Sequence, residues 1–117
     1  MKVPGLRMLA AAGLAVLTMS TAGAGASVVQ KPPKPQMHTV IIDASAFQQE
    51  LLIVNAGDTV VWTNRDLFPH TVTATHGSFD SKAIAPGQSW KYTPKGKGTF
   101  DYKCAYHTTM TAVLKVK

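Results

Sequence analysis

In the stretch Phe100-Asp101-Tyr102-Lys103-Cys104, large or sulfur-bearing residues alternate with charged ones, and Ala112-Val113-Leu114-Lys115-Val116-Lys117 repeats a similar alternation. Successive side chains of a β-strand point to opposite faces of the sheet, so every second residue shares a face. Each stretch therefore places its large apolar residues on one face and most of its charged residues on the other. Both stretches predict β-strands with one buried face and one face in water.

Short runs of this kind recur from Met37 to Lys117, separated by turn residues, and no window shows sustained helical periodicity. The runs predict strands at residues 39–43, 51–54, 59–64, 71–75, 89–93, 99–104 and 112–117. Seven to eight strands in about eighty residues predict an all-β fold, a small Greek-key β-sandwich of two antiparallel sheets packed face to face. We expect Trp62 and Trp90 to fill its core.

The N-terminal segment has the features of an export signal. Lys2 and Arg7 give a positive start, and the apolar run from Met8 to Met19 is shorter than the about 20 residues that span a bilayer. Small residues follow, and they predict cleavage after Ala26, with Ala24 as the second choice. An uncleaved membrane anchor is the alternative. We expect a signal peptide at 1–26, a flexible Pro- and Lys-rich segment at 27–36 and a folded domain at 37–117, located in the periplasm.

The charge of the mature chain excludes one class of partner. Of 12 Lys and Arg residues, the signal would remove Lys2 and Arg7, which leaves ten against six acidic residues, a net charge of +4. Nucleic-acid binding needs a clustered basic stripe with stacking aromatics, and here the basic residues are dispersed. A small cluster of lysines, formed by Lys91, Lys95 and Lys97, either docks an acidic partner or, in the interpretation we favour, lies on a solvated hairpin.

Cys104 is the single cysteine of the chain, so no intramolecular disulfide can form. A domain of this size buries little core and often needs a further stabilising element. An unpaired thiol in an oxidising compartment is also exposed to unwanted chemistry. A metal bound to the thiolate would meet both needs.

The loop between the last two predicted strands carries Cys104, His107 and Met110, and its ends are held in neighbouring strands. His70 begins another strand, and loops at one end of a sandwich gather in space. Two imidazoles, one thiolate and one thioether suit a trigonal copper site with a weak axial Met. Structural zinc prefers several Cys and His ligands. The four residues therefore predict a copper site.

Further stretches match one family: residues 56–64, 69–72 and 77–81, together with 100–104, His107 and Met110. In these stretches the chain resembles the cupredoxins, the small blue copper proteins that include plastocyanin, pseudoazurin and amicyanin. The resemblance covers residues 37–117. The two-residue gap between His107 and Met110 is most similar to that of amicyanin.

The resemblance implies that His70, Cys104, His107 and Met110 hold one copper ion in an eight-stranded sandwich. It implies an exported type 1 blue copper protein that shuttles single electrons between redox proteins in transient complexes and is not an enzyme. An amicyanin-like loop also implies a dehydrogenase as donor and a c-type cytochrome as acceptor. We expect a monomer with no membrane span after cleavage of the signal.

Within the family, the edge of the loop imidazole, here His107, is an electron port in an apolar patch. Phe68, Pro69 and Ala105 are candidates for that patch. The chain departs from the family pattern at two positions. Thr108 stands where amicyanin has Pro, and Thr71 stands where plastocyanin and amicyanin have Asn. The second change leaves the bracing of the loop to a shorter hydroxyl side chain.

Two other functions compete with electron transfer. A thiol enzyme using Cys104 and His107 lacks an evident third group to orient the imidazole, and the domain is small for a substrate cleft. A periplasmic copper carrier or scavenger is the closer alternative. Such carriers use Met- and His-rich tracts, whereas the mature chain keeps only Met37 and Met110. His38 and His76 are interpreted as surface residues remote from the site.

Overall fold

The computed structural model describes residues 5, 13, 15–17, 31 and 33–117. The predicted signal peptide and its cleavage site after Ala26 lie almost entirely outside the described residues. Residues 33–117 belong to one compact unit. No helix in the described part of the chain is long and apolar enough to cross a membrane.

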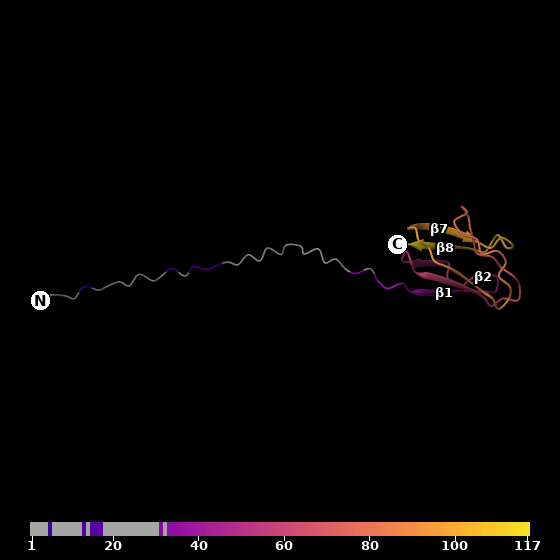
Figure 1. Ribbon diagram of the computed structural model, residues 1–117, viewed down its shortest axis with the longest axis horizontal. Helices are drawn as coiled ribbons and strands as arrows, with labels where there is room; N and C mark the ends of the chain where they lie inside the picture. Colours follow the sequence, from indigo (N-terminus) through magenta and orange to yellow (C-terminus); the bar gives the residue numbers. More distant parts are fainter. Residues whose placement is uncertain (1–4, 6–12, 14, 18–30, 32) are drawn as a thin grey trace. The chain divides into compact units, whose positions relative to one another are not determined.

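Within residues 33–117, eight strands form two four-stranded sheets, which confirms the predicted all-β sandwich. The first sheet has the order β2-β1-β4-β6 and the second the order β3-β8-β7-β5. Figure 1 shows β7 and β8 in one layer and β1 and β2 in the other. In chain order the strands are β1 (Met37–Asp43), β2 (Ala46–Phe47), β3 (Leu51–Val54), β4 (Thr59–Asn64), β5 (Thr73–Ala74), β6 (Ser89–Tyr92), β7 (Gly98–Lys103) and β8 (Thr111–Val116).

The expectation that both sheets are antiparallel is wrong at two pairings. Strand β1 runs parallel to β4, and β3 runs parallel to β8. Parallel neighbours need a crossover connection. The chain provides one, because β3, which follows β1 and precedes β4 in the sequence, belongs to the other sheet. The alternation of side chains predicts strands and faces, but it does not state which strands become neighbours.

Two local details also differ from the sequence prediction. The short strand β2 was not predicted, because two residues are too few to show an alternation. The strand expected at 71–75 is reduced to Thr73–Ala74. Before it, the chain pairs through an isolated bridge of His70 with Ile84, and Thr73 itself makes a second isolated bridge with Asp80. Because the pairing is so short, regular sheet hydrogen bonds do not determine the conformation of the segment around His70.

The core between the sheets is built around Trp62 and Tyr102, which are 0% and 1% exposed. Their rings meet edge to face with centroids 5.7 Å apart, and the indole N–H of Trp62 donates to the Tyr102 hydroxyl over 3.2 Å. Burial raises the pKa of Tyr102 to about 12, so the phenol stays neutral. Trp90 is only partly buried and packs against this cluster from β6, so of the two predicted core tryptophans Trp62 is the central one.

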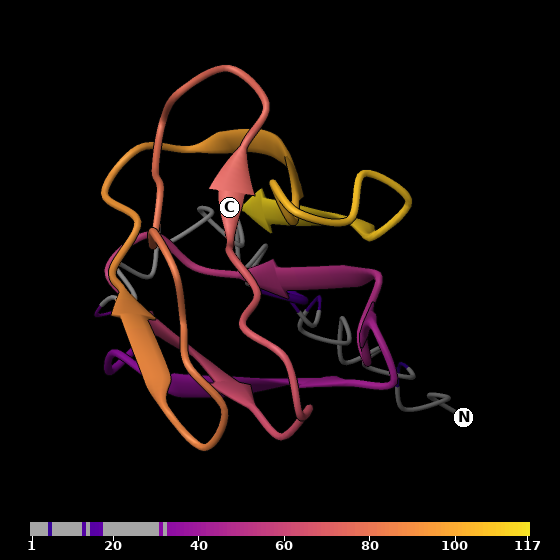
Figure 2. The ribbon, with the colours of Figure 1, turned by 90° about the vertical axis from the view of Figure 1, so that its right-hand side faces the viewer.

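The loop between β7 and β8 lies at the end of the sandwich opposite the C-terminus (Figure 1). Figure 2 shows the same loop, coloured yellow, extending beyond the strands. Its ends are held by the antiparallel pairing of β7 and β8, in which Lys103 opposes Thr111. The segment that follows β4 leaves the first sheet at Asn64, the last residue of that strand.

Candidate metal centre

The β7–β8 loop is a tight turn held by hydrogen bonds between its own backbone groups. The Cys104 N–H donates to the Met110 carbonyl over 3.1 Å, and the Met110 N–H donates to the His107 carbonyl over 2.9 Å. Cys104 and Met110 are buried, whereas His107 is partly exposed. The loop therefore holds three of the predicted ligands in one short segment. Of these three side chains, only that of His107 is partly exposed.

His70 reaches the same region from the segment between β4 and β5. Its backbone is fixed by a bridge to Ile84, with hydrogen bonds of 3.2 and 2.7 Å in the two directions. The fully buried Asn64 holds the preceding turn, since its side-chain N–H groups donate to the carbonyls of Phe68 and Ile84 and its oxygen accepts from the Asp66 N–H. The side chain of Asn64 thus replaces the hydrogen bonds that the sheet no longer supplies.

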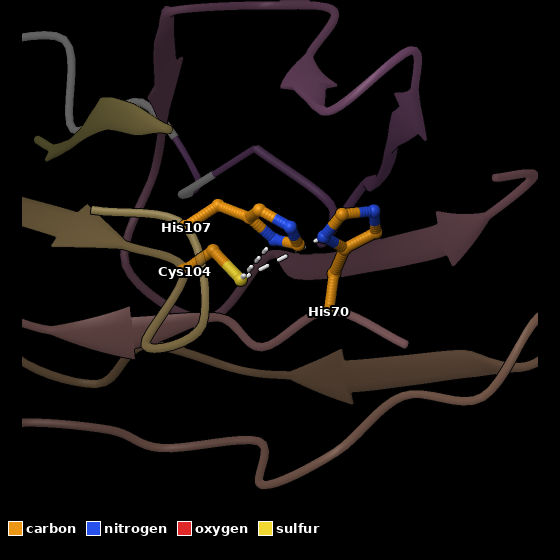
Figure 3. Close-up of side chains that lie close together, drawn as sticks. All are labelled: His70, Cys104 and His107. Atoms are coloured by element: carbon orange, nitrogen blue, oxygen red, sulfur yellow. Dashed lines mark hydrogen bonds between the residues drawn. The ribbon is translucent and has the colours of Figure 1, made fainter. Parts of the chain in front are cut away.

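The donor atoms of His70, Cys104 and His107 lie within 4.8 Å of one another. Figure 3 shows both imidazoles turned toward the Cys104 sulfur, with Nδ1 of His70 at 3.7 Å and Nδ1 of His107 at 3.9 Å. Metal bonds of about 2.0 Å to nitrogen and 2.3 Å to sulfur would place the two atoms about 3.7 Å apart at a trigonal angle. The three side chains therefore have the spacing of ligands around a single ion.

Met110 is 3% exposed and stands one residue before β8. The contacts described above tie its backbone to Cys104 and His107, which places it at the same end of the sandwich. The role of its thioether as an axial ligand stays a prediction.

The thiol of Cys104 is suited to be a thiolate. Burial raises its pKa, but a hydrogen bond from the Thr71 amide, hydrogen bonds with the imidazoles of His107 and His70, and one from the Tyr106 amide outweigh burial and lower the pKa to about 6. The Thr71 N–H lies 3.4 Å from the sulfur. Thiolates, not thiols, bind metals, so the site is prepared for a soft metal ion near neutral pH.

Thr71 braces the loop with its hydroxyl group. Its Oγ1 accepts the Ala105 N–H over 2.7 Å and lies 2.9 Å from the hydroxyl of Thr73. The bracing that the sequence assigned to a shorter side chain at this position is therefore present. Thr71 connects the segment of His70 to the loop of Cys104 from both its backbone and its side chain.

Sequence reasoning gave no role to Asp66, although its carboxylate contacts a predicted ligand. Its Oδ2 lies 2.8 Å from Nε2 of His70, and its side chain is 12% exposed. The four-residue separation of Asp66 and His70 is the one available sequence signal, but outside a helix that spacing does not indicate contact. Asn64 was missed in the same way, because its bonds run to backbone atoms.

The remaining histidines lie outside the cluster. His76 is exposed, as expected. His38 is more than a surface side chain, because its Nε2 lies 2.9 Å from the carboxylate of the buried Asp58 and its side chain is 23% exposed. Among the described residues, the group that could hold a metal consists of His70, Cys104 and His107.

Comparisons with known proteins agree with this geometry. A sequence model of copper-binding proteins of the plastocyanin/azurin family matches residues 35–117. The chain is 31% identical over 85 residues to amicyanin from Paracoccus denitrificans, an alignment that covers 67% of this chain and 65% of amicyanin. The chain thus spans slightly less than two thirds of the length of that curated relative.

Solved structures show the same fold. An oxidised amicyanin mutant superimposes with a TM-score of 0.65 at 27% identity, covering 68% of this chain and 81% of the mutant. A purple cupredoxin from Nitrosopumilus maritimus gives a TM-score of 0.63 at 23% identity, covering 68% of this chain and 99% of that one. The second likeness is one of fold alone.

Proposed function

Because the chain belongs to the plastocyanin/azurin family of copper-binding proteins, we propose that it is an exported, monomeric type 1 copper protein that carries single electrons. One observation supports this most directly. Two imidazole nitrogens and a thiolate of depressed pKa converge on one point, and a single one of the three side chains is partly exposed.

His70, Cys104 and His107 would hold the ion, and the thioether of Met110 would be a weak fourth ligand. This set of two nitrogens, one thiolate and one thioether suits copper better than zinc, which takes several Cys and His ligands in structural sites. Copper supplies one-electron redox chemistry by alternating between Cu(II) and Cu(I). The closed loop and the bridge at His70 hold the ligands in place, so that a change of charge at the site requires little movement of the chain.

Electrons would enter and leave at His107. His70 and Cys104 are 0% exposed, so neither can contact a partner directly. Large apolar side chains on the two loops that build the site are exposed: Leu67 by 85%, Phe68 by 60% and Tyr106 by 56%. Pro69 and Ala105, predicted members of the same patch, are exposed as well. A small apolar surface with an accessible ligand suits short-lived complexes with redox proteins.

The partners and the compartment follow from similarity and from the sequence. Amicyanin is a curated relative, and the amicyanin-like loop favours a dehydrogenase as electron donor and a c-type cytochrome as acceptor, both in the periplasm. Export depends on the predicted signal at residues 1–26. The net charge of +4 on the mature chain favours association with an acidic partner surface.

The test is a visible absorption and electron paramagnetic resonance spectrum of the mature domain after addition of one equivalent of Cu(II). An intense blue band with narrow copper hyperfine splitting is the expected result, since it reports a thiolate–copper bond. A pale spectrum with wide splitting would contradict the assignment. A chelator challenge completes the test, because a copper carrier would surrender its ion readily and an electron carrier would retain it.

A further inference from the structure

We infer that Asp66 is a positioning residue for the copper site: its carboxylate fixes the tautomer and the orientation of His70, so that Nδ1 faces the metal. The inference rests on the proposed function in one respect, namely that His70 is a ligand. It goes beyond that function because it assigns a role to a side chain that contacts neither the thiolate nor the other imidazole.

The two nitrogens of His70 have different surroundings. Nε2 lies 2.8 Å from Oδ2 of Asp66, and Nδ1 lies 3.7 Å from Sγ of Cys104. A carboxylate only accepts hydrogen bonds, so the proton of the neutral imidazole belongs on Nε2. The lone pair of Nδ1 is then directed toward the Cys104 sulfur, at the place where a metal ion would bind (Figure 3).

His70 cannot obtain this arrangement from water. Its side chain is 0% exposed, and burial of an N–H group without an acceptor is unfavourable. Asp66 supplies that acceptor. Without it, the proton could move to Nδ1, where the Cys104 sulfur is the nearby acceptor, and in that tautomer Nδ1 has no lone pair for a metal.

The carboxylate of Asp66 is itself held on both oxygens. The Ser45 N–H donates to Oδ2 over 2.8 Å, and the Leu67 N–H donates to Oδ1 over 2.8 Å. The backbone N–H of Asp66 donates to the buried side chain of Asn64 over 2.9 Å. Rotation of the carboxylate would break at least one of these bonds, so its direction toward His70 is set before any metal arrives.

The turn that provides the Ser45 amide is in an unfavourable conformation. Ala44 and Ser45 join β1 to β2 with φ angles of 49° and 54°, in the left-handed region that glycine and asparagine prefer. Non-glycine residues persist there when surrounding contacts hold them. The bond from Ser45 to Asp66 is such a contact, and it joins the hairpin to the segment of His70.

The experiment uses Asp66→Ala and Asp66→Asn, with Asp58→Ala as the matched control. Asp58 also accepts two backbone N–H groups and a histidine Nε2, but its histidine is His38. Long-range ¹H–¹⁵N spectra of the metal-free proteins report the tautomer of His70, and competitive titration with a chelator reports the affinity for copper.

We expect the Nε2–H tautomer in the wild type, in Asp58→Ala and in Asp66→Asn, whose amide oxygen still accepts the proton. In Asp66→Ala we expect a mixture of tautomers and a copper affinity lower by roughly 10- to 100-fold, the usual effect of removing such a partner. In Asp66→Asn the loss of negative charge should raise the reduction potential while the tautomer is kept.

A wild-type tautomer and wild-type copper affinity in Asp66→Ala would overturn the inference. If Asp66→Ala does not fold, an unchanged potential in Asp66→Asn would overturn it instead. The tautomer is measured without metal, so it is informative even if the wild type gives no blue spectrum. Failure of the proposed function and failure of this inference are therefore separate results.

Discussion

Strands β1 and β4 lie side by side and parallel, and an aspartate–histidine pair stands at each end of this strand pair. Where the strands begin, Asp58 accepts the N–H groups of Gln36 and Asn55 and the Nε2 of His38. Where they end, Asp66 accepts the N–H groups of Ser45 and Leu67 and the Nε2 of His70. The two carboxylates thus have the same set of partners, two backbone N–H groups and one imidazole nitrogen each.

The two ends differ in what lies beyond the imidazole. The His38 side chain is 23% exposed and contacts Asp58, which also accepts the backbone N–H of Gln36. His70 is fully buried, and its other nitrogen faces Cys104. The same carboxylate–imidazole chemistry therefore stabilises the fold at one end, and at the other it orients a proposed ligand. The β7–β8 loop makes the difference, because it adds a thiolate and a second imidazole there.

The largest change is expected from Cys104→Ser, which should remove the intense colour of the copper form. A hydroxyl is a poor soft ligand, so the stabilisation that the metal gives the wild type, about 2.7 kcal/mol at a free copper concentration 100 times the Kd, should also be lost. Absorption spectra and thermal unfolding with and without copper measure both effects. Intense colour that persists would refute the thiolate assignment, and His38→Ala should leave the spectrum unchanged.

Met110→Ala should raise or broaden the reduction potential while copper stays bound. Because Met110 is buried, the truncation should also lower the free energy of unfolding by about 2–5 kcal/mol. Leu114→Ala is the control, since it opens a comparable cavity in β8 but should leave the potential unchanged. Voltammetry and denaturant unfolding separate the two effects. Complete loss of copper from Met110→Ala would make this residue a structural ligand.

Asp58→Ala should lower the Tm by several degrees and leave the copper spectrum as in the wild type. The hydrogen bond from the Gln36 amide, followed by those from His38 and Asn55, lowers the pKa of Asp58. A lowered pKa stabilises the fold at pH values above the ordinary aspartate value of about 3.9, and this stabilisation is lost as the pH falls through the folded-state pKa. The difference in Tm between wild type and variant should therefore shrink in acid. A difference that grows in acid would contradict this account.

The smallest effect is expected from Ala44→Gly at the end of β1. Glycine adopts the φ of 49° without steric cost, so the variant should gain up to about 1 kcal/mol in the free energy of unfolding. Ala46→Gly, in β2, is the control and should lose about 0.5–1 kcal/mol, because there glycine only adds flexibility. Chemical denaturation measures both. Equal losses in the two variants would show that the turn stores no strain.

The sequence predicts most of the fold because alternation is a local property. Seven of the strands lie within runs of strand-forming residues bounded by turn residues, and β7 and β8 show the clearest alternation. The parallel pairing of β1 with β4 is not predicted, since it depends on which sheet each strand enters. The two-residue strand β2 is too short to carry a pattern.

For the site as well, the sequence predicts some of the residues and not others. Residue type and loop position single out His70, Cys104 and His107, and the structure brings these three together. Asp66 and Asn64 could not be identified, because their roles depend on the direction of a side chain in an irregular segment. Met110 was named from its place in the loop, and its role is left to the potential measurement.

By itself, the sequence determined the strand pattern, the single thiol and the imidazole and thioether residues that point to copper, because each follows from residue type and local order. Only the tertiary structure showed that Asp66 pairs with His70 at the site, as Asp58 pairs with His38 away from it. Asp58 and Asp66 have the same kinds of partner. What separates them is the thiolate of Cys104 beside His70, a contact between residues far apart in the chain that forms only when the two sheets pack.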